Sequence, residues 1–343
     1  MLFLPGSIPS SFRASTRCSK TALLMIVKVD RCNPDAEVIR NAGLILRGGG
    51  LVAFPTETVY GLGANGLAPE AVRKIFLAKE RPSDNPLILH LAETKDAEEL
   101  AEVNSRALEV MAAFWPGPLT IVLRARPNVP AEVTAGLSTV ALRMPDHPVA
   151  LALIAAAGCP IAAPSANRSG RPSPTDAEAV TADLGNKVDL VLDSGRVDIG
   201  LESTVIDLTG EKVVLLRPGG VSVEKIETFL GETLELMDDN SKRRSPGTRH
   251  KHYAPTVAVC VWEAGGRLND SINPAMSGFI GISPPPAVFA RVISFESEES
   301  YARGMFAGFR QLEAEGLAIV AEWPGSPGLG LALRDRIKRA SQS

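Results

Sequence analysis

Apolar residues along this chain alternate between two spacings, and this alternation limits the possible folds more than any other feature. Short apolar runs typical of buried strands are separated by stretches in which apolar residues recur at helical spacing. For example, residues 35–46 place Val38 and Ala42 on one helical face, and a short apolar run follows at 51–54. Because alternating strands and helices pack as layers around a sheet, the pattern predicts an α/β protein.

The same reasoning assigns the other elements of the N-terminal two thirds. We expect helices over 70–79, 100–114, 148–157 and 223–229, and strands over 87–91, 119–124, 139–143, 189–193, 203–208 and 213–217. Residues 61–66 match G-x-G-x-x-G, a pattern that directly follows a strand in dinucleotide-binding folds. Here PTET at 55–58 separates the glycines from the preceding strand, so we predict a glycine-rich turn instead.

A polar, basic and turn-rich segment at 234–255 interrupts the alternation. Beyond it we expect strands over 257–262, 278–282, 287–295 and 318–323, and helices over 300–315 and 331–340. The sequence therefore predicts a large α/β domain at 26–230, a linker at 231–255 and a small α/β domain at 256–343. Residues 242–252 hold several Lys and Arg side chains and no acid, which favours a lid that closes on an anionic ligand over a simple tether.

Composition excludes several classes of protein. With 45% hydrophobic and 22% charged residues the chain is globular, and its net charge of −3 provides no overall positive field for a long nucleic acid. The longest apolar run, at 149–157, is much shorter than the ~20 residues of a membrane span. The 4 cysteines form no C-x-x-C pair, which argues against a zinc knuckle and favours a reducing, cytoplasmic compartment.

The N-terminal extension, residues 1–25, is basic and rich in serine. It resembles an organellar transit peptide in composition, and a start codon assigned too far upstream would produce the same pattern. We therefore leave these residues out of the predicted fold.

Several cationic and hydroxyl side chains lie at the predicted ends of helices and strands. Lys79 and Arg81 end a helix, where they either complement the helix dipole or, with Asn85, clamp a phosphate. Arg143 ends an apolar strand and has no acidic sequence neighbour before Asp146, so a bound anion would satisfy its charge. No Ser–His–Asp or Cys–His grouping accompanies them, so the pattern indicates an anion-binding site rather than a covalent nucleophile.

A series of ordered motifs resembles those of the L-threonylcarbamoyladenylate synthases, a family with the YrdC-like fold. The motifs are PTETVYGLG at 55–63, K-x-R at 79–81, WPGPLT at 115–120, S-x-N at 165–167, EST at 202–204 and LRPG at 216–219. SPG at 245–247, HYAP at 252–255 and the extra domain resemble the longer, two-domain form, although TRHK at 248–251 departs from its pattern. The resemblance implies a twisted α/β catalytic domain with a concave basic site, followed by a small Rossmann-like α/β domain.

The resemblance also implies a role for individual residues. Lys79 and Arg81 would be catalytic, and no residue would bind a metal directly, because Mg²⁺ would arrive with ATP. The residues expected to bind L-threonine are Thr58, His90, Arg143, Ala163 and Ser203. Those expected to bind ATP are Arg81, Asn85, Thr139, Ser165, Ser173, Arg217, His252 and Tyr253.

The implied reaction converts L-threonine, bicarbonate and ATP into threonylcarbamoyl-AMP and pyrophosphate. A separate transferase would then use the product to modify the adenosine next to the anticodon of tRNA, so contact with tRNA would be indirect. Two alternatives remain at this stage. The chain could bind double-stranded RNA without synthase activity, which its net charge disfavours, or it could transfer carbamoyl groups like hydrogenase maturation proteins, whose Cys clusters it lacks.

Overall fold

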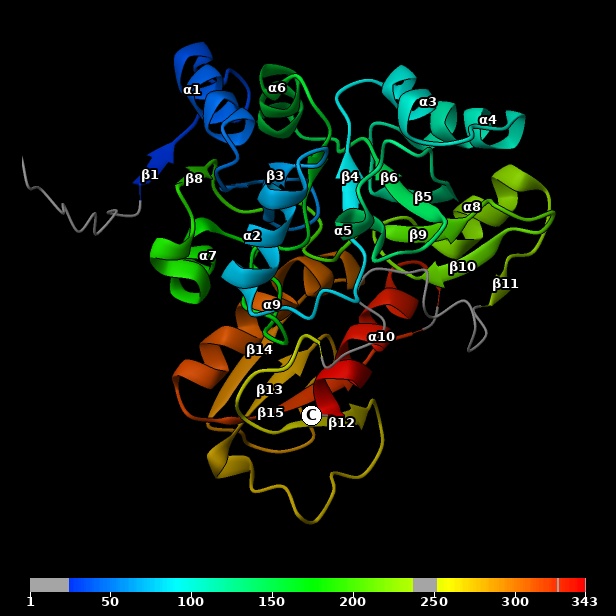
Figure 1. Cartoon of the computed structure of the whole chain (residues 1–343). Helices are drawn as coiled ribbons and strands as arrows, with labels where there is room; N and C mark the ends of the chain where they lie inside the picture. The colour runs from blue at the N-terminus through cyan, green and yellow to red at the C-terminus, as the bar shows by residue number, and fades with distance from the viewer. Residues whose placement is uncertain (1–24, 237–251, 326, 343) are drawn as a thin grey trace, which may run out of the picture.

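The computed structural model describes residues 25–236, 252–325 and 327–342, which form two sheets with their covering helices (Figure 1). Most of the predicted N-terminal extension and most of the predicted linker lie outside the described residues. Of the predicted lid at 242–252, only His252 belongs to the described residues.

The larger sheet has 11 strands in the order β1-β8-β2-β3-β7-β4-β6-β5-β9-β10-β11 and mixes parallel with antiparallel pairs. Its strands are β1 (Met25–Lys28), β2 (Val52–Phe54), β3 (Gly61–Asn65), β4 (Ile88–His90), β5 (Leu119–Arg124), β6 (Thr139–Arg143), β7 (Ile161–Ala162), β8 (Leu190–Asp193), β9 (Thr204–Asp207), β10 (Val214–Arg217) and β11 (Glu235–Leu236). Strands β4 and β6 run parallel, whereas β5 is antiparallel to β6 and β10 is antiparallel to β9. This topology brings the ends of β4, β6 and β10 next to the starts of β5 and β9.

The helices packed with this sheet are α1 (Ala36–Arg47), α2 (Pro69–Lys79), α3 (Ala97–Leu100), α4 (Ser105–Phe114), α5 (Ala131–Thr134), α6 (Pro148–Ala157), α7 (Ala177–Leu184) and α8 (Val223–Leu230). Sequence signals fix several of their ends. Asp35 caps the first turn of α1 with its carboxylate, and Gly158 ends α6 in the left-handed conformation at φ 63°. None of the helices in the described part of the chain combines the length and the apolar character needed to cross a bilayer.

The smaller sheet consists of β12 (Val259–Glu263), β13 (Ser277–Gly281), β14 (Arg291–Ser294) and β15 (Ala318–Trp323) in the order β12-β15-β13-β14, and all its pairs are parallel. Helices α9 (Glu298–Ala314) and α10 (Gly330–Ser341) complete this unit, and buried Tyr301 and Phe306 of α9 pack in its core. The α/β fold with a second, Rossmann-like α/β unit is confirmed.

Helices α9 and α10 lie between the small sheet and the larger part of the molecule (Figure 1). Arg310 of α9 forms an ion pair with Asp183 at 2.7 Å, and Arg171 pairs with Glu313 of α9 at 2.5 Å. Gly200 touches α9 so closely that a Cβ atom there would lie 2.5 Å from the Ala302 carbonyl oxygen. The two units are therefore joined by close packing as well as by charge.

Three sequence expectations were wrong in detail. The predicted helix at 100–114 begins only at Ser105, as α4, and Leu100 instead ends the short α3. The two are separate because Ala101 is extended and bridges to Ala125, and the Asn104 side chain caps α4. The predicted turn at 61–66 is mostly strand β3, whose glycines allow close packing: a Cβ on Gly63 would lie 2.9 Å from Ile161. The predicted strand at 287–295 shortens to β14.

Candidate active site

A cavity opens where the ends of β4, β6 and β10 meet the loops that follow β2 and β7. It is lined by Thr56, Thr58, Val59, Gly61, Arg81, Pro86, Leu87, Ile88, His90, Arg143, Ala163, Pro164, Ser165, Asn167, Ser173, Glu202, Ser203, Arg217, His252 and Tyr253. The parallel register of β4 and β6 places His90 opposite Arg143, which explains why two residues far apart in the sequence share one wall. His252 and Tyr253 reach the cavity from the end of the linker, and both are buried.

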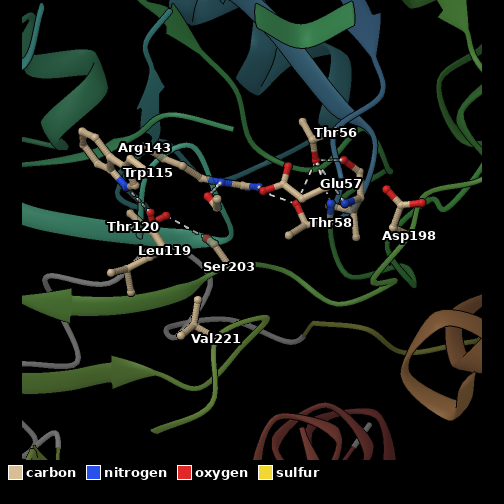
Figure 2. Close-up of polar contacts among 12 residues, drawn as sticks. Thr56, Glu57, Thr58, Trp115, Leu119, Thr120, Arg143, Asp198, Ser203 and Val221 are labelled. Atoms are coloured by element: carbon tan, nitrogen blue, oxygen red, sulfur yellow. Dashed lines mark hydrogen bonds and ion pairs between the residues drawn. The ribbon is translucent and has the colours of Figure 1, made fainter. Parts of the chain in front are cut away.

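Arg143 is buried and held by three residues of two loops, the loop after β2 and the loop before β5 (Figure 2). Its Nε donates to the Gly117 carbonyl at 3.2 Å, its Nη1 to the Thr58 hydroxyl at 3.0 Å, and its Nη2 to Glu57 Oε1 at 2.5 Å. No acid is a close sequence neighbour of Arg143, but folding brings Glu57 from 86 positions away, so Arg143 has a charge partner before any anion binds. A guanidinium has five N–H donors, so two of those on Arg143 remain available to a carboxylate or another anion.

His90 contributes a neutral imidazole to the same wall. Burial, reinforced by the positive charge of Arg143, lowers the pKa of His90 to about 3. Its ring stands edge-on to Phe54, with 6.3 Å between the ring centroids, and its Nδ1 finds no hydrogen-bond partner within the described residues. A buried ring nitrogen in this state can accept a hydrogen bond from a ligand or donate one to it, depending on its tautomer.

Ser203 and Arg217 form the wall at the start of β9. The Ser203 hydroxyl lies 2.7 Å from the Thr120 hydroxyl (Figure 2), and the Arg217 Nη2 donates to the Ser203 carbonyl at 2.9 Å. Burial lowers the pKa of Arg217, partly offset by the nearby Tyr253. The backbone crossing is tight, because a Cβ on Gly219 would lie 2.3 Å from the Glu202 carbonyl oxygen.

Arg81 and Lys79 occupy different positions although they are nearly adjacent. Helix α2 ends at Lys79, and Glu80 takes a left-handed conformation at φ 53°, so the chain turns and Arg81 lines the cavity. The Nε of Arg81 has no hydrogen-bond partner among the described residues, and burial lowers the pKa of Arg81 to about 10. Lys79 is buried behind the wall, where its Nζ donates to the carbonyl oxygens of Ser165 and Asn167.

Burial and the charge of Arg81 hold the pKa of Lys79 well below its usual range. Within the described residues, no carboxylate forms an ion pair with Lys79 or with Arg81. The positive charge at this end of the cavity therefore comes from guanidinium groups such as Arg81, which suit a phosphate ligand.

The structure brings together most of the site residues that the sequence predicted. Lining the cavity are Thr58, Arg81, His90, Arg143, Ala163, Ser165, Ser173, Ser203, Arg217, His252 and Tyr253. Lys79 and Asn85 are buried next to the cavity but do not line it, and Thr139 begins β6 at the opposite end of that strand from Arg143.

Sequence reasoning assigned no role to Glu57, Thr56 or Glu202. All three lie within motifs that the sequence made recognisable, but only the tertiary contacts distinguish them from their neighbours. Glu202 is the one acid among the described residues that line the cavity, and both of its oxygens are already bound, to Ser173 and to Arg336. The described residues contain no group of three or more His, Cys, Asp or Glu side chains placed to hold a metal ion.

The donor set therefore suits an anionic ligand that brings its own cation. Guanidinium groups and hydroxyls are available to carboxylate and phosphate oxygens, whereas a free carboxylate pair for Mg²⁺ is not found in the described lining. Such a site can neutralise developing negative charge and position reactants without forming a covalent intermediate.

Comparisons with known proteins agree with this arrangement. A family model described as "Telomere recombination" matches residues 44–219, and one described as "Threonylcarbamoyl-AMP synthase, C-terminal domain" matches residues 221–342. A threonylcarbamoyl-AMP synthase of Pyrococcus abyssi is 44% identical over 320 residues, which cover 88% of this chain and 94% of that protein. Another, of Bacillus subtilis, is 41% identical over 339 residues, covering 94% of this chain and 98% of that protein.

The same similarity extends to three dimensions. The crystal structure of P. abyssi Sua5 complexed with L-threonine superposes with a TM-score of 0.84 at 41% sequence identity. The superposition covers 93% of this chain and 98% of that chain, so it includes both sheets.

Proposed function

Since the chain belongs to the threonylcarbamoyl-AMP synthase family, as its motifs indicated, we propose that it joins L-threonine, bicarbonate and ATP into threonylcarbamoyl-AMP and releases pyrophosphate. The chain is an enzyme of the nucleotidyltransferase type. One observation carries the proposal for the reaction: Arg81, Arg143 and Arg217, from three different elements, converge on one cavity that holds no Ser–His or Cys–His pair in its described lining.

Threonine binds at the Arg143 wall in this proposal. The two remaining N–H donors of Arg143 hold the substrate carboxylate, while Glu57 keeps the guanidinium oriented and neutralised before substrate enters. Thr58, Ser203 and the neutral His90 surround the amine and the hydroxyl, and the backbone of Ala163 completes this end. The threonine complex of the P. abyssi relative supports threonine as the ligand.

ATP occupies the end of the cavity that is rich in guanidinium groups. Arg81 and Arg217 face the phosphates, and Ser165 and Ser173 supply hydroxyl donors. His252 and Tyr253 cover this end from the linker. Asn85 and Thr139 remain assigned to the nucleotide, as residues outside the cavity lining. Lys79 acts on the phosphates indirectly, because its Nζ binds the Ser165 carbonyl and so holds the loop that carries Ser165.

The chemistry takes two steps, each of which forms one bond and breaks another. The threonine amine attacks the carbon of bicarbonate and water leaves, which yields a carbamate. A carbamate oxygen then attacks the α-phosphorus of ATP, the bond to the β-phosphate oxygen breaks, and pyrophosphate departs. When bound as MgATP, Mg²⁺ would supply charge neutralisation at the phosphates. The chain's own residues orient the carbamate and exclude water from the resulting mixed anhydride.

We further propose that the product serves a separate cytoplasmic transferase that modifies tRNA next to the anticodon. The motif resemblance implies this destination. The net charge of −3 suits a protein that releases a small-molecule product better than one that binds RNA directly.

A single assay tests the proposal. The purified full chain is incubated with MgATP, bicarbonate and L-threonine, pyrophosphate is measured, and threonylcarbamoyl-AMP is identified by mass. We expect pyrophosphate release that depends on threonine, with L-serine and no added amino acid as controls. Release that ignores threonine, or retention of double-stranded RNA without pyrophosphate release, would contradict the synthase and favour the RNA-binding alternative.

A further inference from the structure

Arg336 of helix α10 crosses from the small domain to the wall of the catalytic cavity. Its side chain is one of the largest that are fully buried among the described residues, with 0% of its surface exposed. Its Nε donates to Glu202 Oε2 at 2.7 Å, and its Nη2 donates to the Pro218 carbonyl at 3.1 Å. Its Nη1 bonds to Asp335, its neighbour in the helix. One guanidinium thus joins α10 to the two loops that carry Ser203 and Arg217.

Glu202 transmits this contact directly to the cavity. Its second oxygen, Oε1, accepts a hydrogen bond from Ser173, and both Glu202 and Ser173 line the cavity. Burial alone would raise the pKa of Glu202, but Arg336 and then Arg217 outweigh it and lower the pKa, so the carboxylate is ionised. An ionised Glu202 can only accept hydrogen bonds, which fixes the direction in which the Ser173 hydroxyl points.

Tyr253 is the second link between Arg336 and the cavity. The Arg336 guanidinium carbon lies 5.0 Å from the centre of the Tyr253 ring. Phe306 of α9 stacks on that ring at 5.5 Å, and the His252 ring lies tilted against it at 5.6 Å. Tyr253 also has an unusual backbone conformation, with φ 67°. The guanidinium over the ring and the stacked Phe306 hold this residue in a conformation that it would not favour by itself.

Docking of the two units does not require this arrangement. The Arg310–Asp183 and Arg171–Glu313 pairs also join them, but these pairs lie away from the cavity lining and keep partial contact with solvent. A buried ion pair usually stabilises a fold no more than apolar residues of the same shape would. The buried position of Arg336 is therefore better explained by its orientation of Glu202 and Tyr253 than by a contribution to the stability of domain docking.

We infer that Arg336 is a positioning residue, through which the small domain orders the nucleotide end of the catalytic cavity. It holds Glu202, and with it Ser173, from one side and Tyr253 from the other. This inference rests on the proposed function only for the identity of the ligand, MgATP. It predicts that the small domain contributes to nucleotide affinity without touching the nucleotide.

The test compares Arg336→Lys and Arg336→Met in the full chain with Lys338→Met, which removes a cation from an exposed position of the same helix. Lysine keeps the charge near Glu202, but its single ammonium cannot also bond the Pro218 carbonyl and cover the Tyr253 ring as the guanidinium does. We measure MgATP binding by calorimetry, KM for ATP and for threonine, and thermal unfolding.

We expect both Arg336 variants to weaken MgATP binding by about tenfold or more, the range of coupling between residues of one network. KM for threonine should change much less, and Lys338→Met should match the wild type. Adding Glu202→Gln to Arg336→Lys should weaken binding little further, because both act through one path. If Arg336→Met fails to fold, the MgATP affinity of Arg336→Lys alone tests the inference.

Two results would overturn the inference: folded Arg336→Lys with wild-type MgATP affinity, or a lower unfolding temperature with unchanged KM values, since either means that Arg336 only docks the domain. The proposed function fails differently. In that case the wild type binds MgATP but shows no threonine-dependent pyrophosphate release, and the binding comparison among the variants still stands.

Discussion

Replacing Arg143 by methionine separates its role in binding threonine from its role in the folded structure. Arg143 and Glu57 form a buried pair, with 4% and 6% of their side chains exposed, so Arg143→Met alone leaves a buried carboxylate without its partner. The double variant Glu57→Gln with Arg143→Met removes that charge as well. The two variants therefore have the same deficit toward substrate and different deficits in stability.

The magnitudes follow from the contacts. Two free N–H donors on Arg143 can each make a charge-assisted hydrogen bond, at about 1.5–3 kcal/mol apiece. Their loss should reduce kcat/KM for threonine by about 10²–10⁴-fold, at 1.36 kcal/mol per factor of ten. Leaving a buried charge unpaired costs about 3–5 kcal/mol of unfolding free energy, most of which the double variant should recover.

Urea unfolding and pyrophosphate release measured against threonine concentration check both parts. We expect the single variant to be unstable and inactive toward threonine, and the double variant to be stable and equally inactive. ATP binding should persist in the double variant. If the double variant regains both stability and a wild-type KM for threonine, Arg143 serves only to neutralise Glu57, and the assignment of the threonine carboxylate to it is refuted.

Three further outcomes follow from the same cavity. Arg81→Ala should slow ATP–pyrophosphate exchange by about 10²-fold with little change in stability. Lys79→Met should instead lower the free energy of unfolding by about 2–3 kcal/mol, because two buried carbonyls lose their donor. Equal effects of the two variants on exchange and on stability would contradict this. The pKa of His90 is about 3 in the folded chain and about 6.5 in the unfolded chain. As the pH is lowered below about 6.5, the unfolded chain binds a proton at this residue before the folded chain does, so the free energy of unfolding decreases. That loss reaches about 2 kcal/mol by pH 5, and urea unfolding of His90→Asn should lack it. Tyr253→Ala should raise KM for ATP more than KM for threonine, and unchanged steady-state constants would show that Tyr253 is no part of the nucleotide site.

Much of the local structure follows from neighbouring residues. Proline at the start and glycine after the end define α6, and the acid before α1 caps it, so these helices were predicted nearly to their ends. The small domain was also predicted well, because each of its strands and helices has its own apolar pattern. Predictions were least accurate where pairing with a distant segment determines the secondary structure. Gly61–Asn65 is a strand because β2 and β7 pair with it on either side, and no local sequence pattern shows this.

The sequence by itself determined the α/β class, most of the longer strands and helices, and the cations and hydroxyls at strand ends that suit an anionic ligand. Tertiary structure alone decided which of these side chains meet. Glu57 reaches Arg143 across 86 positions, and Arg336 reaches Glu202 across 134, so neither pair leaves a periodic signal. The physical reason is that periodicity records which face of an element is buried, whereas the partner of a buried charge is fixed by strand register and domain packing.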